Sequence, residues 1–257
     1  MGSALTGEQS PGMIDWAAMP TYNTIMSVAV GAGLLAVVLL FMDLRKASGV
    51  DEASERRRQL STDGWAIAFG VLGLLLTATG LHMTLTWPLA AGGFAFDNII
   101  FGETSLAFGV LMLGAAVYLW KRGAEIKADP TPLKLAARTV RPLSIFIAAL
   151  GLALFAIAIA GVTYQLFAAP PQEPISGAFA DYPMIEATFM SVLFALVGVG
   201  ALVFPFAANS VLRTPAAAKS GGAVKTVGIM FTVTGVVFVL FGAMNYFTHI
   251  GLVVNTM

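Results

Sequence analysis

The sequence predicts an all-α protein that crosses a membrane six times as one helical bundle. Three observations predict this: hydrophobic residues make up 58% of the 257 residues, charged residues make up only 11%, and the apolar residues gather in six long runs. Soluble domains average roughly 45–50% apolar and about 25% charged residues. The composition therefore excludes an ordinary soluble domain, a disordered chain and a nucleic-acid-binding protein. The absence of cysteine also excludes disulfides and thiolate metal sites.

Each apolar run is long enough to cross a hydrocarbon core of roughly 30 Å, which takes about 20 residues of helix. The runs are too long and too uniformly apolar to be the strands of a membrane barrel. Glycine is frequent in them, and Gly198 and Gly200 are candidates for a close approach between helices. We treat residues 1–257 as a single transmembrane domain with spans at residues 24–42, 64–87, 98–120, 142–167, 183–207 and 226–250.

The basic residues predict the orientation in the membrane. All 14 Lys and Arg residues fall on the three loops that follow the first, third and fifth spans. The positive-inside rule then places these loops in the cytoplasm and both termini outside a cytoplasmic membrane. The first 22 residues lack the features of a signal peptide. The loops carry no Gly-rich phosphate-binding segment, so we expect no nucleotide partner. The outer side carries acidic residues and no basic one: Glu8, Asp15, Asp97, Glu103, Glu173, Asp181 and Glu186.

Two predicted helix hairpins, formed by the second and third spans and by the fourth and fifth spans, begin their returning helices in a similar way. Asp97 precedes Glu103 in one, and Asp181 precedes Glu186 in the other. We expect the two aspartates to act as helix N-caps and Pro183 to occupy a first helical turn. A parallel repeat about an axis along the membrane normal is one interpretation. Chance similarity between two apolar hairpins is the other.

Four residues that could bind a metal lie near the predicted outer ends of four different helices. They are His82, Glu103, Glu186 and His249, and the chain has 2 histidines in all. Two histidines and two carboxylates form a ligand set that suits a transition metal such as zinc, iron, manganese or copper. A second interpretation is haem b, with His82 and His249 as its cofactor-binding residues. A third is structural, because acidic residues are stabilised near helix N-termini by the helix dipole.

Two short segments carry a resemblance to a known family: Asn98-Ile99-Ile100-Phe101-Gly102-Glu103 and Met13-Ile14-Asp15-Trp16. The chain resembles a family of uncharacterised bacterial and archaeal integral membrane proteins, classed as a domain of unknown function. The resemblance covers about two-thirds of the chain and implies a topology, with no activity attached.

The expected function is that of an integral membrane subunit of a larger complex of respiratory or oxygenase type. Short loops and the scarcity of polar residues inside the spans favour this interpretation. The expected partners are the lipid bilayer and other membrane subunits. A small-molecule or ion transporter and a stand-alone membrane metalloenzyme are the alternatives, so whether the protein is an enzyme stays open.

Overall fold

The computed structural model describes residues 4–49, 51–87, 94–215 and 221–257, and in this part of the chain the regular structure is entirely helical. A π-helical turn, η1 (Asn98–Glu103), leads directly into α4, and a 3₁₀ turn, η2 (Ser176–Phe179), comes before α7. The α-helices are α1 (Asn23–Lys46), α2 (Asp51–Gln59), α3 (Thr62–Leu85), α4 (Thr104–Ala128), α5 (Pro132–Val140), α6 (Ser144–Thr163), α7 (Pro183–Arg213) and α8 (Gly222–Thr256).

Six helical segments are long and apolar enough to cross a membrane, namely α1, α3, η1 with α4, α6, α7 and α8. The predicted all-α fold with six spans is therefore confirmed. The third, fifth and sixth helices run several residues further than predicted, to Ala128, Arg213 and Thr256. Hydropathy marks where a helix leaves the apolar layer, whereas its hydrogen bonds continue beyond that layer, into charged residues in the third and fifth helices. The α7 helix also continues through Pro205.

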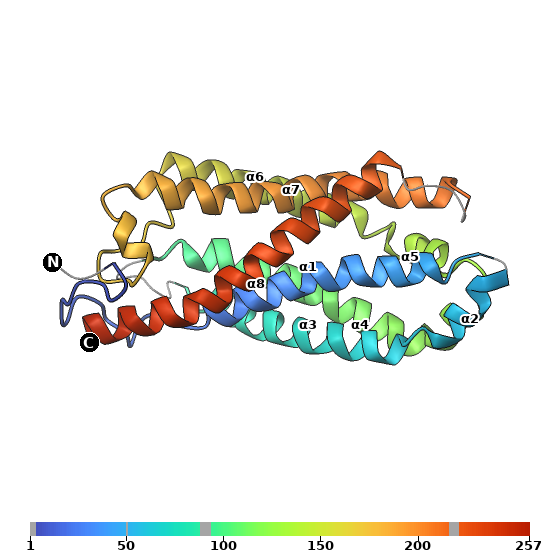
Figure 1. Cartoon of the computed structure of the whole chain (residues 1–257), viewed down its shortest axis with the longest axis horizontal. Helices are drawn as coiled ribbons and strands as arrows, with labels where there is room; N and C mark the ends of the chain where they lie inside the picture. The colour runs from blue at the N-terminus through green and yellow to red at the C-terminus, as the bar shows by residue number, and fades with distance from the viewer. Residues whose placement is uncertain (1–3, 50, 88–93, 216–220) are drawn as a thin grey trace.

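The six long helices form two groups that α8 connects (Figure 1). The α3–α4 hairpin packs with α1 in one group, and the α6–α7 hairpin forms the other. The α8 helix begins beside α7 and crosses diagonally to pack along α1. Both predicted hairpins thus exist as antiparallel helix pairs, while their relation by a repeat stays a prediction.

Glycines bring the two helices of the α3–α4 hairpin into backbone contact. A Cβ atom at Gly80 would lie 2.4 Å from the Leu106 amide nitrogen, and one at Gly73 would lie 3.0 Å from the Gly109 carbonyl oxygen. From the other helix, a Cβ atom at Gly109 would lie 2.6 Å from the Thr77 amide nitrogen. Such approaches are typical of membrane helix pairs, where small residues let backbones pack closely.

A row of glycines on α8 shows where α8 separates from α1. Gly228, Gly235 and Gly242 are seven residues apart and therefore lie on one face of the helix. A Cβ atom at Gly235 would lie 3.0 Å from the Gly31 carbonyl oxygen, and one at Gly242 would lie 2.8 Å from the Val28 amide nitrogen. At Gly228, by contrast, nothing lies within 4 Å of such an atom. The face that α1 fills at two positions is open at the third.

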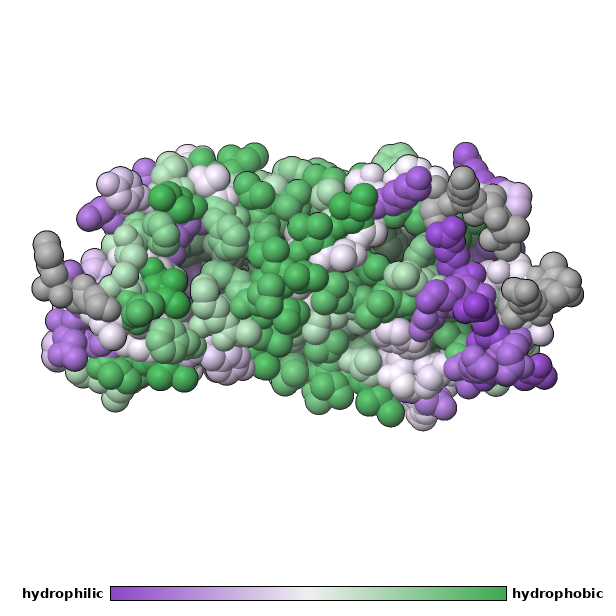
Figure 2. All heavy atoms as spheres, viewed as in Figure 1, coloured by the Kyte–Doolittle hydropathy of each residue, from purple (hydrophilic) through white to green (hydrophobic). Residues whose placement is uncertain are grey.

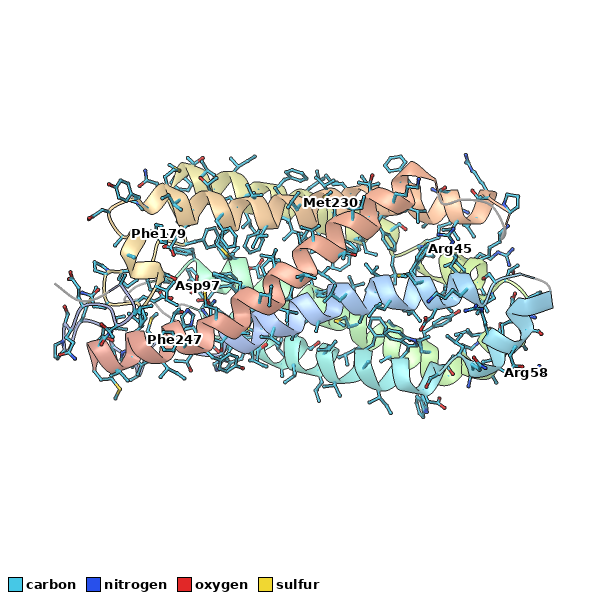
Figure 3. The ribbon with its side chains drawn as sticks, in the orientation of Figure 1. Arg45, Arg58, Asp97, Phe179, Met230 and Phe247 are labelled. Carbon is cyan, nitrogen blue, oxygen red and sulfur yellow. The ribbon has the colours of Figure 1, made fainter. Side chains whose placement is uncertain are left out.

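The two ends of the bundle carry net charges of opposite sign. Figure 2 shows hydrophilic residues at both ends and an apolar band between them. We call one the basic end, made of residues 43–49, 51–63, 121–143, 209–215 and 221–225, and the other the acidic end, made of residues 4–22, 86–87, 94–103, 164–186 and 247–257. Lys219 lies outside the described residues. Both chain termini lie at the acidic end (Figure 1). Figure 3 shows Arg45 and Arg58 at the basic end, and Asp97, Phe179 and Phe247 at the acidic end.

The expected roles of three residues at helix starts are settled by the structure. Pro183 occupies the first turn of α7, as predicted. The prediction that Asp181 is an N-cap was wrong, and Asp97 occupies the N-cap position of η1 without the predicted side-chain hydrogen bond. The residue before α7 is Tyr182. The π-helical turn changes the position of the amides that follow Asp97, and Asp181 is one residue too early to reach those of α7.

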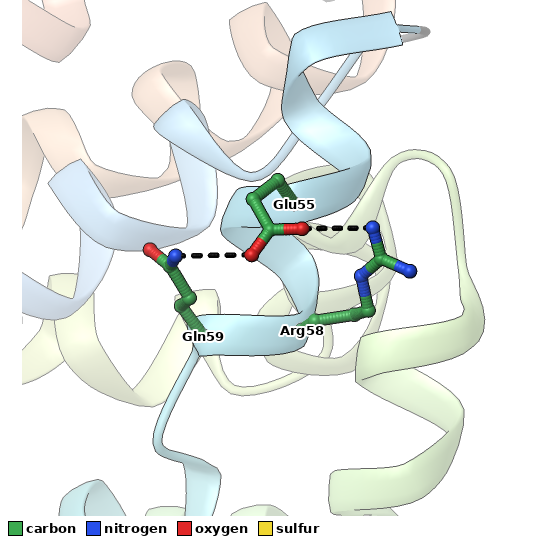
Figure 4. A network of polar contacts seen from close by, with 3 residues as sticks. All are labelled: Glu55, Arg58 and Gln59. Atoms are coloured by element: carbon green, nitrogen blue, oxygen red, sulfur yellow. Dashed lines mark hydrogen bonds and ion pairs between the residues drawn. The ribbon is translucent and has the colours of Figure 1, made fainter.

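At the basic end, short helices that hydropathy could not predict fill the loops. In α2, Glu55 accepts hydrogen bonds from Arg58 at 2.7 Å and from Gln59 at 3.1 Å (Figure 4). Arg57 donates to the carbonyl oxygens of Ala47 and Gly49 and so ties α2 to the end of α1. Helix α5 is attached to the same place, because the Leu133 amide donates to the Ser48 hydroxyl at 3.2 Å.

Candidate binding cavity

Two of the predicted ligand residues, His82 and Glu103, are exposed on the surface of the bundle. His82 lies in the last turn of α3, where its Nδ1 atom is 2.5 Å from the Tyr22 hydroxyl. The two rings meet edge to face, with their centroids 5.7 Å apart. Glu103 is the last residue of the π-helical turn. His82 has an aromatic neighbour, and the Glu103 carboxyl is exposed. Both observations fit a structural role for these residues better than metal or haem binding.

The other two predicted ligand residues, Glu186 and His249, lie at the acidic end beside a carboxyl that the sequence analysis did not select. His249 Nε2 is 3.8 Å from Glu173 Oε1, which makes an ion pair when the imidazole is protonated. Glu186 accepts a hydrogen bond from the Ala169 amide at 2.5 Å. Burial raises the pKa of Glu173 to about 7. The negative charge of Glu186 adds to this shift, and the neighbouring Thr248 hydroxyl opposes it.

The structure does not bring His82, Glu103, Glu186 and His249 together as one group. Among the described residues, no three His, Asp or Glu side chains lie close enough to hold one metal ion. Depth along each helix could be read from the sequence, but the direction in which each side chain points around the helix could not. Metal or haem binding by these residues stays a prediction that the geometry does not support.

A roof covers the acidic end and is made of three segments that are far apart in the sequence. Asn255 donates to the carbonyl oxygens of Thr6 at 2.6 Å and Gln172 at 2.8 Å. The Trp16 indole donates to the Thr256 hydroxyl at 2.9 Å. The chain start, the α6–α7 loop and the end of α8 are thereby joined. Glu173 follows Gln172 in the α6–α7 loop and is buried, with 8% of its surface exposed.

A large apolar cavity lies between the two helix groups. Its volume is about 1040 Å³, and α1, α4, α6, α7 and α8 contribute most of its lining. On α1 the lining extends from Asn23 to Arg45, a distance of about 33 Å at 1.5 Å per residue. That length is similar to the thickness of a bilayer core, about 30 Å. Ligand pockets usually measure roughly 300–1,000 Å³, so this cavity could take a long molecule.

The lining of the cavity holds few polar groups, and two of them have no partner. The Oδ1 atom of Asn23 and the hydroxyl of Tyr118 are buried and make no hydrogen bond with the described residues. Buried polar atoms are nearly always paired, so unpaired ones mark positions where a bound molecule or water completes the bonding. Asn23 lies at the acidic end of the cavity, and Tyr118 lies further along, on α4.

Different residues line the cavity toward its two ends. On the side of the acidic end, Phe101, Phe194 and Phe238 form a cluster across the two groups, with neighbouring centroids 6.3 and 6.4 Å apart. At the basic end, α5 turns Leu133 and Ala137 into the cavity. Pro132 begins α5, where its missing N–H costs nothing.

Comparisons with known proteins agree with the resemblance seen in the sequence. No curated protein and no solved structure matches the chain. The family described as "Protein of unknown function (DUF981)" matches residues 18–251, which is most of the chain. The chain therefore belongs to the DUF981 family.

Proposed function

We propose that the protein is a membrane-embedded binding subunit that holds a long lipophilic molecule in the cavity between its two helix groups. The observation that carries this proposal is the apolar cavity itself, which has a volume of about 1040 Å³ and runs the length of α1. The open position at Gly228, which lines this cavity, shows the same space from the side of α8. The glycine face of α8 packs closely against α1 at Gly235. At Gly228, the same face has no neighbouring atom of the described residues within 4 Å of a Cβ position.

Membership of a larger complex is the part of this proposal that rests on the sequence. The loops are short, and the interior of the spans carries few polar groups, as in chains that support or position a molecule for a partner subunit. Ion transport has less support. Among the described residues, the cavity lining carries no charged side chain between its two ends, whereas ion paths through membranes are marked by charged residues.

Filling part of the cavity with a larger side chain is expected to weaken the binding of a lipophilic molecule. A Gly228→Phe variant places a large ring where a Cβ atom meets nothing within 4 Å, so the fold should accept it. The probe is hexadecanol with a mid-chain diazirine, which labels nearby residues after illumination. Labelling of the purified wild type should be saturable and map to peptides of α1, α7 and α8. The apparent affinity of the variant should fall at least about tenfold, the effect of losing roughly 1.4 kcal/mol.

The matched control for this experiment is Gly222→Phe. Gly222 begins the same helix, its Cβ position is equally open, and it does not line the cavity. The control should label like the wild type, and all three proteins should have similar thermal unfolding temperatures. Unsaturable labelling, or equal labelling of Gly228→Phe and wild type, would refute the proposed function.

We further propose that the basic end faces the cytoplasm and the acidic end faces outside, as the positive-inside rule predicts. Since the chain has no cysteine, single cysteines can report on each end. An Asp181→Cys variant should react with a membrane-impermeant maleimide in intact cells, and Glu125→Cys should react only after lysis. Both positions are exposed, so the reverse pattern would mean the opposite orientation.

A further inference from the structure

The cavity has a charge at one end only. Among the described residues that line it, the charged ones are Arg45, near the end of α1, and Lys225, in the first turn of α8. Both belong to the basic end, and no carboxylate is found in the part of the lining that the structure describes. A molecule that fills the cavity therefore meets apolar side chains along most of its length and two cations at one end.

Some basic residues at the same end are engaged by neighbouring groups, whereas the two that line the cavity are not engaged by any described group. Arg58 pairs with Glu55 at 2.7 Å, Arg122 pairs with Glu125, and Arg57 donates to two backbone carbonyls. Neither Arg45 nor Lys225 makes an ion pair with a described carboxylate.

The nearest acidic residue along the chain from Arg45 is Asp43, which is engaged elsewhere. Its Oδ2 atom accepts a hydrogen bond from the Trp65 indole at 3.2 Å, on the α3 side of α1. Among the described residues, Arg45 and Lys225 therefore remain without an ion-pair partner where they line the cavity.

We propose that the occupant of the cavity is an anionic lipid, with its acyl chain along α1 and its headgroup between Arg45 and Lys225. This inference rests on the proposed function, since it names the class of molecule that the cavity holds. Cations near a membrane surface attract anionic lipids by about 1 kcal/mol each. A tail that reaches the phenylalanine cluster and a headgroup at the basic end use both features of the lining. The headgroup then lies at one membrane surface, where lipid headgroups normally reside.

The test compares two probes that share one tail. Hexadecanoic acid and hexadecanol, each with the same mid-chain diazirine, are offered to the purified protein at pH 8. Wild-type protein should bind the acid at least about tenfold more tightly than the alcohol, because two cations act on the headgroup. An Arg45→Gln/Lys225→Gln variant should lose this preference while its affinity for the alcohol stays unchanged. Unchanged alcohol labelling also shows that the variant is folded.

An Arg138→Gln/Arg141→Gln variant is the matched control. It removes the same charge from exposed residues of the basic end that do not line the cavity, so it should keep the preference for the acid. If wild type bound acid and alcohol equally, the anionic-lipid inference would be refuted and the proposed function would stand. Absence of saturable labelling by both probes would refute the proposed function.

Inorganic phosphate distinguishes a lipid headgroup from a free anion. Phosphate has the charge of a headgroup without the tail, and at millimolar concentration it should leave labelling by the acid unchanged. Displacement of the acid by phosphate would mean that Arg45 and Lys225 bind a soluble anion, and the lipid assignment would be overturned.

Discussion

Replacing Gly80 with alanine is expected to lower the free energy of unfolding by about 3 kcal/mol, the upper part of the range for overpacked sites. The new methyl group would lie 2.4 Å from the Leu106 amide nitrogen and 2.8 Å from the Gly102 carbonyl oxygen. These are backbone atoms of the partner helix, which no rotamer change can move. The α3–α4 pair would have to separate, and α1 packs on this pair.

The control for this substitution is Gly70→Ala, in the same helix. A Cβ atom at Gly70 would lie 3.8 Å from the Ala116 Cβ atom, an ordinary contact. This variant should be neutral or slightly stabilising, because alanine favours a helix over glycine by up to about 1 kcal/mol. Thermal unfolding in detergent, followed by circular dichroism, measures both. Equal unfolding temperatures for the two variants would contradict the tight α3–α4 contact.

The number and approximate positions of the membrane helices could be predicted because one strong physical constraint determines where such helices form. A lipid environment requires every backbone polar group to be paired within the helix, so a run of apolar residues of sufficient length has one structural solution. The loop helices α2 and α5 escaped prediction because they are short and partly polar. Their hydrogen bonds to the end of α1, such as that of Arg57 with the Gly49 carbonyl, depend on tertiary structure.

The candidate site residues could be predicted only in part, because the sequence indicates depth along a helix and does not indicate side-chain direction or the burial of loop residues. Depth along the helices predicted one layer for the four residues, but it could not predict their neighbours: His82 contacts Tyr22, and His249 contacts Glu173. The π-helical turn at residues 98–103 alters the helical phase in front of α4, which simple helical periodicity does not include. Glu173 was recognised as one of the outer acids and was missed as a site residue, because nothing in a loop indicates burial.

One signal for the cavity was present in the sequence. Gly228, Gly235 and Gly242 are spaced as a single helix face, so the sequence could identify a small-residue surface on the last helix. Which part of this surface would be filled depends on the angle at which α8 crosses α1 (Figure 1). That angle is a property of the packed bundle, so the volume beside Gly228 could be found only in the structure.

The acidic end is expected to make stability fall as the pH rises from about 5 to 8. Burial raises the pKa of Glu173 from 4.5 in the free side chain to about 7 in the folded protein. Between these values the folded state keeps a proton that the unfolded state has lost, so a rising pH favours unfolding. At 1.36 kcal/mol per pKa unit, the loss amounts to about 3 kcal/mol. Asp97, whose pKa burial also raises to about 7, acts in the same direction.

A Glu173→Gln variant separates the contribution of Glu173 from that of Asp97. Glutamine keeps the shape of the protonated carboxyl and cannot ionise, so the variant should lose much less stability between pH 5 and pH 8 than wild type. Glu8→Gln, which changes an exposed acid at the same end, should keep the wild-type pH dependence.

The loss of stability at high pH is expected to act on the roof, because Glu173 lies in the α6–α7 loop that forms part of it. The backbone of this segment is constrained, because the β-branched residue Ile175 has a φ of 66°, an unfavourable value for such a side chain. Its amide donates to the Ala4 carbonyl at 2.8 Å, which helps to hold the segment in place. A charged Glu173 facing Glu186 in this fixed position cannot move into water without opening the roof. Unfolding in detergent at pH 5, 6, 7 and 8 measures the effect. An unchanged pH dependence in Glu173→Gln would show that another group is responsible.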